Sequence, residues 1–450
     1  MAGISKWLLG FLLFAMAFRA NCQSYDSITK NEKEIQYFES LTLRLYYEAK
    51  WDSLLNMGQL AISKGYNYYY MLLRVGAASY YTNKYSLAAR YLENARKLYG
   101  ADDFTNELLF YAYIYTGRNQ QASLLKKDLS LELKLKLRKT IGNIFYFEGG
   151  PIMTDGDLHA EKLMKNNSII TFSDKYFEKN AVYFVTGWRQ PVKNRFWLTA
   201  SVSYLDFNKH RDVQIKYWDS LGGDYKVRQT EYYFSAGYTV NNRIFISPCL
   251  RLTDTKVSEP ITSADTITKL YLGLPVSKSF NDHVWGGEFL YAANYWKASA
   301  GAWSLRIGDT KSWQLSTSLV LLPMGNLNLY AITSFTWKSS EINSPYVISQ
   351  SCGVKLVNRT WLEVTGTYGN VAGTSEYNGQ LLNNQINKSK YRLSSIVLID
   401  LSSKMRFSLR YQYMKNESQA WFLNEEYKLI EKSYNYNRHI ITGGLTWDVL

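Results

Sequence analysis

Histidine is the side chain best suited to acid–base chemistry near neutral pH, and the sequence has four, His159, His210, His283 and His439. A hydrolase of the serine type needs such a histidine beside a serine or an aspartate. His210 has Asp206 and Asp212 nearby in sequence. The nucleophile-elbow, zinc-protease and phosphate-loop motifs are absent from the sequence. We therefore predict no catalytic residue and no enzyme, with an outer-leaflet hydrolase that uses His210 kept as an alternative.

The composition also argues against metal, cofactor and nucleic-acid binding. Four histidines and three cysteines leave little for zinc, haem or iron–sulfur chemistry, so no metal site and no cofactor are predicted. The net charge of +14 is spread along the chain without a basic stripe, which argues against a nucleic-acid partner. Aromatic residues make up 16% of the chain, and so many rings must be buried or lie at an interface. Intrinsic disorder is therefore excluded.

Residues 1–22 predict a signal peptide. Lys6 precedes an apolar stretch, Trp7–Phe18, that has the length of a signal-peptide core. Small residues stand at Ala20 and Cys22, which places cleavage before Gln23. A buried helix and a lipid-modified Cys22 remain as alternatives. Past this segment no apolar run is long enough for a membrane-spanning helix.

Residues 23–138 predict paired helices that repeat every 34 residues. Apolar residues recur three and four apart, and three positions match across the period: Trp51 with Tyr85, Leu54 with Ala88, and Ala61 with Ala95. Small residues let two helices approach closely while aromatic rings fill the gaps between pairs. The segment resembles tetratricopeptide repeats in about three copies, clearest over residues 69–100. That copy lacks the usual tryptophan, which is replaced by Leu72, and the final proline, which is replaced by Gly100.

The resemblance implies a concave face that binds a periplasmic protein or a glycan. It places six tyrosines on or near that groove, namely Tyr46, Tyr47, Tyr80, Tyr81, Tyr111 and Tyr115. A tyrosine combines an apolar ring with a polar tip, which suits contacts with peptides or sugars. The alternative is that most of these rings pack between helices.

Residues 139–450 change to an alternation of period two. Between Met405 and Tyr413 apolar side chains share one face and polar side chains share the other, and the segment from Phe196 to Tyr204 behaves alike. Such stretches have the length of a tilted strand that crosses a bilayer. We predict an antiparallel transmembrane β-barrel of about 14 strands, with an error of two strands accepted. A soluble β-sandwich is the rival. The two cysteines of this part, Cys249 and Cys352, fall on distant strands and should be free thiols.

Short and long links alternate between the predicted strands, as in outer-membrane barrels with tight periplasmic turns and long outer loops. The short links are predicted at Val192–Asn194, Asn241-Asn242, Asn281-Asp282, Met324–Asn326, Asn358-Arg359 and Ser402–Lys404. The longer links are predicted at 155–179, 210–229, 258–267, 297–311, 372–389 and 422–438. His283 then lies beside a turn on the periplasmic rim, and Trp303–Arg306 could add a strand. Both ends of the barrel and the helical domain lie on the periplasmic side.

Fourteen strands enclose a narrow channel or cavity. Alternation places nine charged side chains in the lumen, five basic and four acidic. One is Asp448, and the other eight are the candidate lumen residues, Arg251, Glu288, Lys355, Glu363, Arg392, Asp400, Arg406 and Arg410. Mixed charges usually pair across a lumen and stiffen its wall, whereas a modest basic excess would favour anions. A second set of aromatic residues at strand ends predicts the girdles that flank a membrane, namely Trp188, Trp296, Trp337, Trp361, Tyr413 and Trp447.

The last segment, Thr442–Val449, resembles the C-terminal signal of outer-membrane barrels. The whole layout resembles the YaiO-like outer-membrane proteins and, more loosely, the exopolysaccharide export porins that carry periplasmic tetratricopeptide repeats. That resemblance implies a protein of the cell outer membrane, a conduit or docking barrel in the export of a polysaccharide or another envelope component. A non-conducting scaffold subunit of an outer-membrane assembly is the other main hypothesis.

Overall fold

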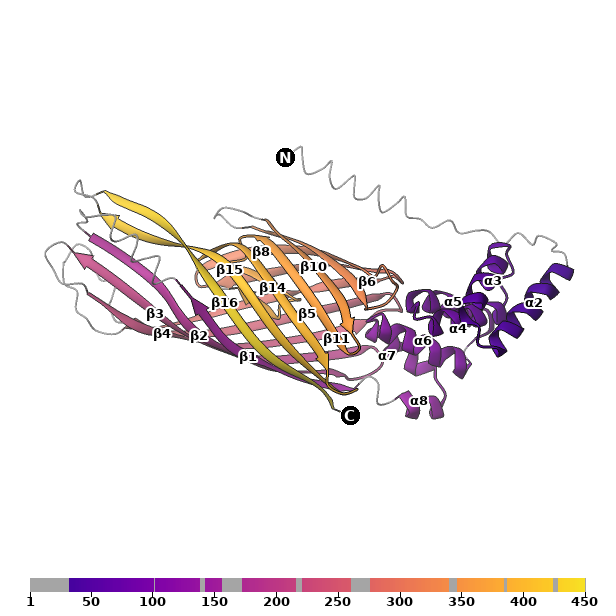
Figure 1. Ribbon diagram of the computed structural model, residues 1–450. Coiled ribbons are helices and arrows are strands. Elements are labelled where there is room, and N and C mark those ends of the chain that lie inside the picture. Colours follow the sequence, from indigo (N-terminus) through magenta and orange to yellow (C-terminus); the bar gives the residue numbers. More distant parts are fainter. Residues whose placement is uncertain are drawn as a thin grey trace, which may run out of the picture.

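The computed structural model describes residues 32–100, 102–137, 142–155, 172–215, 221–259, 276–339, 346–383, 387–423 and 428–449 (Figure 1). The predicted signal peptide and His159 lie outside these residues. The helices gather at one end of a long barrel of strands. The predicted fold class, helices followed by a closed antiparallel barrel of 14 strands, is confirmed.

The helices follow one another in pairs. The first pair is α2 (Glu32–Tyr47) and α3 (Trp51–Ser63), the second is α4 (Tyr69–Tyr81) and α5 (Tyr85–Tyr99), and the third is α6 (Asp103–Tyr115) and α7 (Asn119–Leu125). A short 3-10 turn, Lys126–Asp128, and α8 (Leu131–Leu137) complete this helical domain. The turn inside each pair holds one residue with positive φ, and these residues, Ala49, Asn83 and Gly117, are 34 residues apart. The spacing seen in the sequence is thus present in the backbone.

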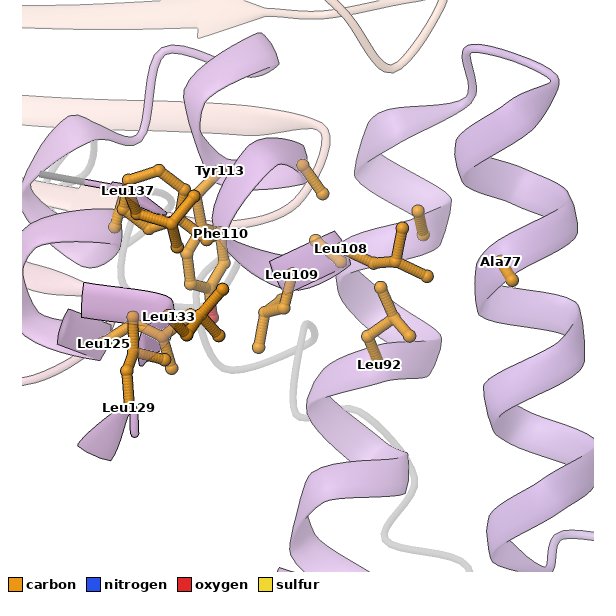
Figure 2. Close-up of a cluster of buried hydrophobic side chains, with 14 residues drawn as sticks. Ala77, Leu92, Leu108, Leu109, Phe110, Tyr113, Leu125, Leu129, Leu133 and Leu137 are labelled. Carbon is orange, nitrogen blue, oxygen red and sulfur yellow. The ribbon is translucent and has the colours of Figure 1, made fainter. Parts of the chain in front are cut away.

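Small residues at the contacts between helices let the helical domain pack closely. A β-carbon on Gly76 of α4 would lie 2.7 Å from a methyl carbon of Leu92 on α5, so no larger residue fits there. One apolar cluster joins the second and third pairs to α8, and Leu92, Phe110 and Leu133 belong to it (Figure 2). Among the described residues, no helix has the length and apolar character needed to cross a bilayer.

The barrel is made of strands that pair with their neighbours in the sequence. They are β1 (Asn143–Thr154), β2 (Phe172–Pro191), β3 (Phe196–Ile215), β4 (Leu221–Thr239), β5 (Ile244–Glu259), β6 (Val276–Ala292), β7 (Trp296–Ile307), β8 (Thr310–Leu321), β9 (Leu329–Lys338), β10 (Tyr346–Val357), β11 (Thr360–Gly369), β14 (Lys388–Asp400), β15 (Met405–Leu423) and β16 (Leu429–Val449). The pairing of β1 with β16 closes the barrel. Two further strands, β12 (Thr374–Glu376) and β13 (Leu381–Asn383), pair only with each other.

The two ends of the barrel differ in their links. At one end, the turn rim, the links are residues 192–195, 240–243, 293–295, 322–328, 358–359 and 401–404. At the other end, the loop rim, they are residues 155–171, 216–220, 260–275, 308–309, 339–345, 370–387 and 424–428. Five of the six predicted short turns are confirmed, and all lie on the turn rim. The helical domain sits against this rim (Figure 1).

The sixth predicted turn, Asn281-Asp282, is wrong. Strand β6 passes through it without a break, and the predicted outer link 297–311 instead contains most of strand β7, including the possible extra strand at Trp303–Arg306, and the start of β8. Asp282 is buried, and its carboxylate accepts a hydrogen bond from the backbone N–H of Gly308 at 2.7 Å. The inner face of such a barrel is polar, so an Asn-Asp pair can lie inside a strand.

The same correction moves His283. It lies within β6, where it pairs in register with Arg306 near the end of β7, and this end belongs to the loop rim. The true turn between β6 and β7 is Ala293–Tyr295. The two strands predicted on either side of Asn281-Asp282 are one strand, β6, whereas β7 was predicted as a link. The strand count is therefore still 14.

Alternation along the strands separates an apolar outer face from a polar inner face. On β3, Phe196 and Val202 are exposed on the outside, whereas Thr199, Ser201 and Ser203 are buried on the inside. Trp296 and Trp447 are exposed near the turn rim, as girdle residues should be. An outer surface of this kind suits lipid rather than water.

Trp361 is wrong as a girdle residue. It shares the inner face with Glu363, two residues along β11, and its indole N–H donates to the carbonyl of Leu327 at 3.2 Å. The Lys355 ammonium lies 5.2 Å from the centre of the Trp361 ring, and the Arg406 guanidinium lies 5.5 Å from it. Successive residues of a strand face opposite ways, so Trp361 and Glu363, which are two residues apart, point to the same inner face.

The two described cysteines are free, as predicted. Cys249 is buried on the inner face of β5 and Cys352 is exposed on β10. No disulfide therefore constrains the barrel within the described residues.

Candidate functional site

The eight predicted lumen residues occupy inner positions of the strand register, and most of them have a polar partner there. The set is Arg251, Glu288, Lys355, Glu363, Arg392, Asp400, Arg406 and Arg410. Arg406 Nε lies 2.5 Å from Asp400, and Arg410 Nε lies 3.6 Å from Glu148. The hydroxyl of Tyr330 donates to Glu363 at 2.6 Å. These pairs join side chains of different strands, as expected if the mixed charges of the lumen pair with each other and stiffen its wall.

Arg251 is the most buried of the set and forms an ion pair with Glu231 of β4. Ser203 also donates to Glu231, and Gln229 donates to it at 2.6 Å. Removing one partner from such a buried pair typically costs about 3–5 kcal/mol, because the other charge is left without a counter-ion. The sequence prediction missed Glu231, although alternation with Tyr232, which faces outward, would have placed it in the lumen.

A hairpin inside the lumen is the main feature that the sequence prediction missed. The link between β11 and β14, predicted as part of an outer loop, folds inward as residues 370–383, and we call this segment the inner hairpin. Its two short strands are buried or half-buried, and Val371 and Leu382 are almost fully covered. Three consecutive residues at its tip, Tyr377, Asn378 and Gly379, have positive φ, which turns the chain sharply.

The base of the inner hairpin is fixed near the loop rim. The ammonium of Lys338, at the end of β9, donates to the carbonyl oxygens of Asn370 and Ala372. Gln314 of β8 forms a reciprocal pair with the backbone of Ser375: its amide donates to the carbonyl at 2.5 Å, and its side-chain oxygen accepts from the N–H at 2.8 Å. These wall residues are almost fully buried.

The tip of the inner hairpin reaches the opposite wall. Tyr233 of β4 donates to the carbonyl of Asn378 at 3.0 Å, and Arg251 of β5 donates to the carbonyl of Gly379 at 3.3 Å. The side chain of Gln380 donates to the hydroxyl of Tyr146, close to the turn-rim end of β1, at 2.5 Å. In the closed strand order β4–β5 stand across the barrel from β11 and β14, which carry the inner hairpin, and β1 stands across from β8, so the inner hairpin spans the lumen from wall to wall.

A charged contact joins the inner hairpin to β14. Arg392 is buried and lies 2.8 Å from Glu376 of β12. This contact is an ion pair, whereas Gln314, Tyr233 and Gln380 join the inner hairpin to the wall by hydrogen bonds between neutral groups. All of these contacts are non-covalent.

The helical domain docks on part of the turn rim, at the links 240–243, 293–295 and 322–328. Ser86, at the start of α5, donates from its backbone N–H to the carbonyl of Gly325 at 2.8 Å and from its hydroxyl to the carbonyl of Asn294 at 2.5 Å. The Asn326 side chain donates to the carbonyl of Asn83 at 2.9 Å, and Lys297 donates to the carbonyl of Gly117 at 2.8 Å. The turns inside the second and third helix pairs are therefore the parts that dock.

Arg118 is the central anchor of this contact. It is 1% exposed and lies 3.0 Å from Glu93 within the helical domain. It also donates to the side-chain oxygen of Asn294 at 2.9 Å and to the carbonyl of Asn242 at 3.4 Å on the turn rim. Its guanidinium lies 4.4 Å from the centre of the Tyr113 ring. One buried cation thus joins both parts of the molecule.

The six predicted groove tyrosines belong to one row of aromatic rings on the helical domain. Tyr47, Tyr81 and Tyr115 are exposed, whereas Tyr46, Tyr80 and Tyr111 pack partly against the apolar clusters. Neighbouring rings of the row have centroids 4.4–6.4 Å apart, and the row runs through Tyr47, Tyr46, Trp51, Tyr81, Tyr80, Tyr85, Tyr115 and Tyr111. Trp51 and Tyr85 were not in the predicted set, although these two residues occupy matching positions of the 34-residue repeat.

Two tyrosines of this row have a raised pKa. Burial raises the pKa of Tyr46 and of Tyr80, and the neighbouring tyrosines add to the effect. The hydroxyl groups of these two residues therefore stay protonated at neutral pH and can donate hydrogen bonds.

The described histidines show a different arrangement from the one considered for a hydrolase. His210 Nδ1 lies 2.6 Å from Asp224, and neither Asp206 nor Asp212 is the carboxylate paired with it. Asp206 lies 3.8 Å from Arg228 and Asp212 lies 3.6 Å from Lys175. His439 is hydrogen-bonded to Tyr411 at 2.8 Å. In the described part of the chain no group of three or more His, Cys, Asp or Glu side chains could hold a metal ion.

No protein-family model matches the chain, and no curated protein matches it. Among solved structures, a FadL homologue of Pseudomonas aeruginosa is similar with 9% identity and a TM-score of 0.42, covering 75% of this chain and 94% of that one. The toluene transporter TodX of Pseudomonas putida has 9% identity and a TM-score of 0.42, over 67% of this chain and 89% of that one. The translocator domain of the autotransporter NalP from Neisseria meningitidis has 8% identity and a TM-score of 0.29, over 71% of this chain and 92% of that one. These are all β-barrel comparisons at low similarity, and the fold rests on the strand pairing of this chain.

Proposed function

We propose that the protein is an outer-membrane conduit whose lumen is closed by the inner hairpin and opens when that hairpin moves. The observation that carries the proposal is the inner hairpin itself, which spans the lumen but is held there only by non-covalent contacts. A barrel of this size without such an insert would enclose more space than its wall side chains fill. A closure that is made of hydrogen bonds and one ion pair, without a covalent bond, can be reversed.

The proposed orientation places the turn rim and the helical domain in the periplasm. Outer-membrane barrels carry their short turns on the periplasmic side and their longer loops outside. The helical domain docks on the rim with the short turns, and both ends of the barrel chain, Asn143 and Val449, lie at this rim as well.

We further propose that the cargo is a polysaccharide or another envelope component, and that the helical domain holds the cargo or a periplasmic partner. The resemblance of the paired helices to tetratricopeptide repeats supports a binding role, and the row of aromatic rings gives that role a surface. Tyr47, Tyr81 and Tyr115 expose ring faces there, and such faces stack well against sugar rings and peptide side chains.

A disulfide that locks the inner hairpin tests the conduit. A β-carbon on Gly379 would lie 3.7 Å from the β-carbon of Cys249, which is within the range of about 3.5–4.5 Å found in disulfides. Gly379→Cys, with Cys22 and Cys352 replaced by serine, should therefore cross-link to Cys249 on oxidation. We expect the conductance of the barrel in a planar bilayer to disappear on oxidation and to return with a reductant.

Gly373→Cys in the same background is the matched control. Gly373 also has positive φ, but a β-carbon there meets no atom within 4 Å, so its thiol should find no partner. Equal conductance of the oxidised and reduced Gly379→Cys protein, with the cross-link confirmed by mass spectrometry, would contradict the proposed gate. A barrel that never opens under any of these conditions would contradict the conduit as a whole.

A non-conducting scaffold is the second candidate. The specific observation in its favour is that the inner hairpin spans the lumen and the helical domain docks on part of the turn rim. The scaffold then needs a protein partner on the aromatic row. In a pull-down from the envelope fraction, Tyr80→Ala combined with Tyr81→Ala should release that partner, and retention of every partner would exclude this surface.

A further inference from the structure

Helix α8 has one covered and one uncovered leucine face. Leu133 and Leu137 are 4% and 0% exposed and belong to the apolar cluster of the helical domain (Figure 2). Leu131 and Leu135 are 75% and 61% exposed. Residues four apart lie on the same side of a helix, so the exposed pair forms a small apolar patch of its own. Nothing among the described residues covers this patch.

The position of α8 brings this patch close to the lipid-facing wall of the barrel. Five residues separate Leu137 from Asn143, the first residue of β1, so the two are at most about 21 Å apart. Figure 1 shows α8 beyond the turn rim, on the side where the C-terminal end of β16 lies. Lys126, shortly before α8, is close enough to Asp448 of β16 for a charge interaction.

The charges around the patch match a phospholipid surface. Lys127 and Lys136 are exposed, and Lys134 precedes Leu135 in the chain. Lys127 lies 3.9 Å from Asp128, Lys136 lies 2.6 Å from Glu107, and Glu132 is exposed, so the basic excess is modest. Short amphipathic segments with leucine on one side and lysine beside it lie in the headgroup region of membranes.

We infer that the exposed face of α8, formed by Leu131 and Leu135, rests on the leaflet next to the turn rim and binds phospholipid. The contact continues the lipid-facing surface of β1 and β16, where Phe145 and Trp447 are exposed on the outside of the barrel near the same rim. It gives the helical domain an anchor on the membrane in addition to its anchor on the barrel. The inference goes beyond the proposed function, since it holds whether or not the lumen conducts.

A fluorescent label on α8 tests the inference in the full chain. The three native cysteines are replaced by serine, Leu135→Cys is introduced, and the new thiol carries a dye whose emission depends on polarity. The folded protein is reconstituted into vesicles of phosphatidylethanolamine and phosphatidylglycerol that contain nitroxide-labelled lipid. We expect a blue shift of the emission and a loss of intensity caused by the lipid nitroxide.

Leu60→Cys is the matched control, because Leu60 is also an exposed leucine of the helical domain but lies on α3, in the first helix pair. Its label should show neither a blue shift nor quenching. Equal quenching at positions 60 and 135 would overturn the inference. A blue shift at position 135 without quenching would also overturn it, since the patch would then be covered by protein, either a second copy or another part of this chain.

Discussion

Gln314 offers a direct way to measure how firmly the inner hairpin closes the lumen. Its side chain makes two hydrogen bonds to the backbone of Ser375, at 2.5 Å and 2.8 Å, and neither of them can persist once the hairpin leaves the lumen. Gln314→Ala therefore destabilises the closed state and leaves the open state nearly unchanged. Both residues are buried when the lumen is closed, so water does not replace the lost partners.

The magnitude follows from the two bonds. Each net hydrogen bond of this kind contributes about 0.5–1.5 kcal/mol, so the closed state should lose about 1–3 kcal/mol. Since about 1.4 kcal/mol corresponds to a tenfold change in an equilibrium constant, the ratio of open to closed barrels should rise roughly 5- to 150-fold. The assay is the open probability of single barrels in planar lipid bilayers, with the wild type measured in the same lipid.

Gln350→Ala is the matched control. Gln350 lies on β10, is exposed on the outer face, and accepts a hydrogen bond at 2.7 Å from the hydroxyl of Thr333 on the neighbouring strand. It makes the same change of side chain without touching the inner hairpin. An open probability that stays equal for wild type, Gln314→Ala and Gln350→Ala, in correctly folded protein, would refute the reasoning that these contacts hold the gate.

Three further predictions concern the helical domain and the closure of the barrel. Arg118→Ala leaves Glu93 buried without its partner, so the free energy of unfolding of the helical domain should fall by about 3–5 kcal/mol in chemical denaturation, whereas exposed Arg90→Ala should change it by less than about 0.5 kcal/mol. A β-carbon at Gly150 would overlap the carbonyl oxygen of Ile441 across the pair of strands that closes the barrel, so Gly150→Ala should lower the refolded fraction on a heat-modifiability gel; Gly443→Ala, which meets no atom within 4 Å, should not. Burial and the hydrogen bond to Asp102 raise the pKa of Tyr69 to about 12 from its usual 10.0, so the protonated phenol is favoured in the folded state. Its contribution to stability should be complete below pH 10 and disappear as the pH rises through about 12, which the difference in melting temperature between wild type and Tyr69→Phe across this range measures.

The strands could be predicted where one face meets lipid and the other meets a polar interior. The alternation from Met405 to Tyr413 predicts a strand clearly, because an apolar outer face requires an apolar residue at every second position. The prediction of strands failed where the two faces of a strand differ less in polarity. Asn281-Asp282 has the composition of a turn, but Asp282 points inward and binds Gly308, and local sequence does not distinguish the two cases.

The inner hairpin could not be predicted from local sequence. Residues 370–383 have the composition of a polar link, and their place in the lumen depends on Gln314, Tyr233 and Arg251, which lie far away in the chain. Val371 and Leu382 are the local signal that was available, since buried apolar residues are unusual in an exposed loop.

The groove tyrosines show a third limit of prediction from the sequence. The sequence placed all six near one face, and the structure divides them by exposure: Tyr47 is 79% exposed, whereas Tyr80 is partly packed against an apolar cluster. Adjacent residues of a helix such as Tyr80 and Tyr81 point about 100° apart, so one of them can serve the core while the other faces outward. Which of the two does so depends on the helix that packs beside them.

The way in which the inner hairpin is attached gives the barrel a preferred direction. Both of its ends join strands at the loop rim, while its tip rests on Tyr146 near the turn rim. A molecule that pushes from the turn rim would drive the tip back toward its own attachment and release it, as a flap swings on its hinge. A molecule that pushes from the loop rim would press the same tip toward the turn rim, where the helical domain docks. With the orientation proposed above, such a barrel would let molecules pass outward more readily than inward.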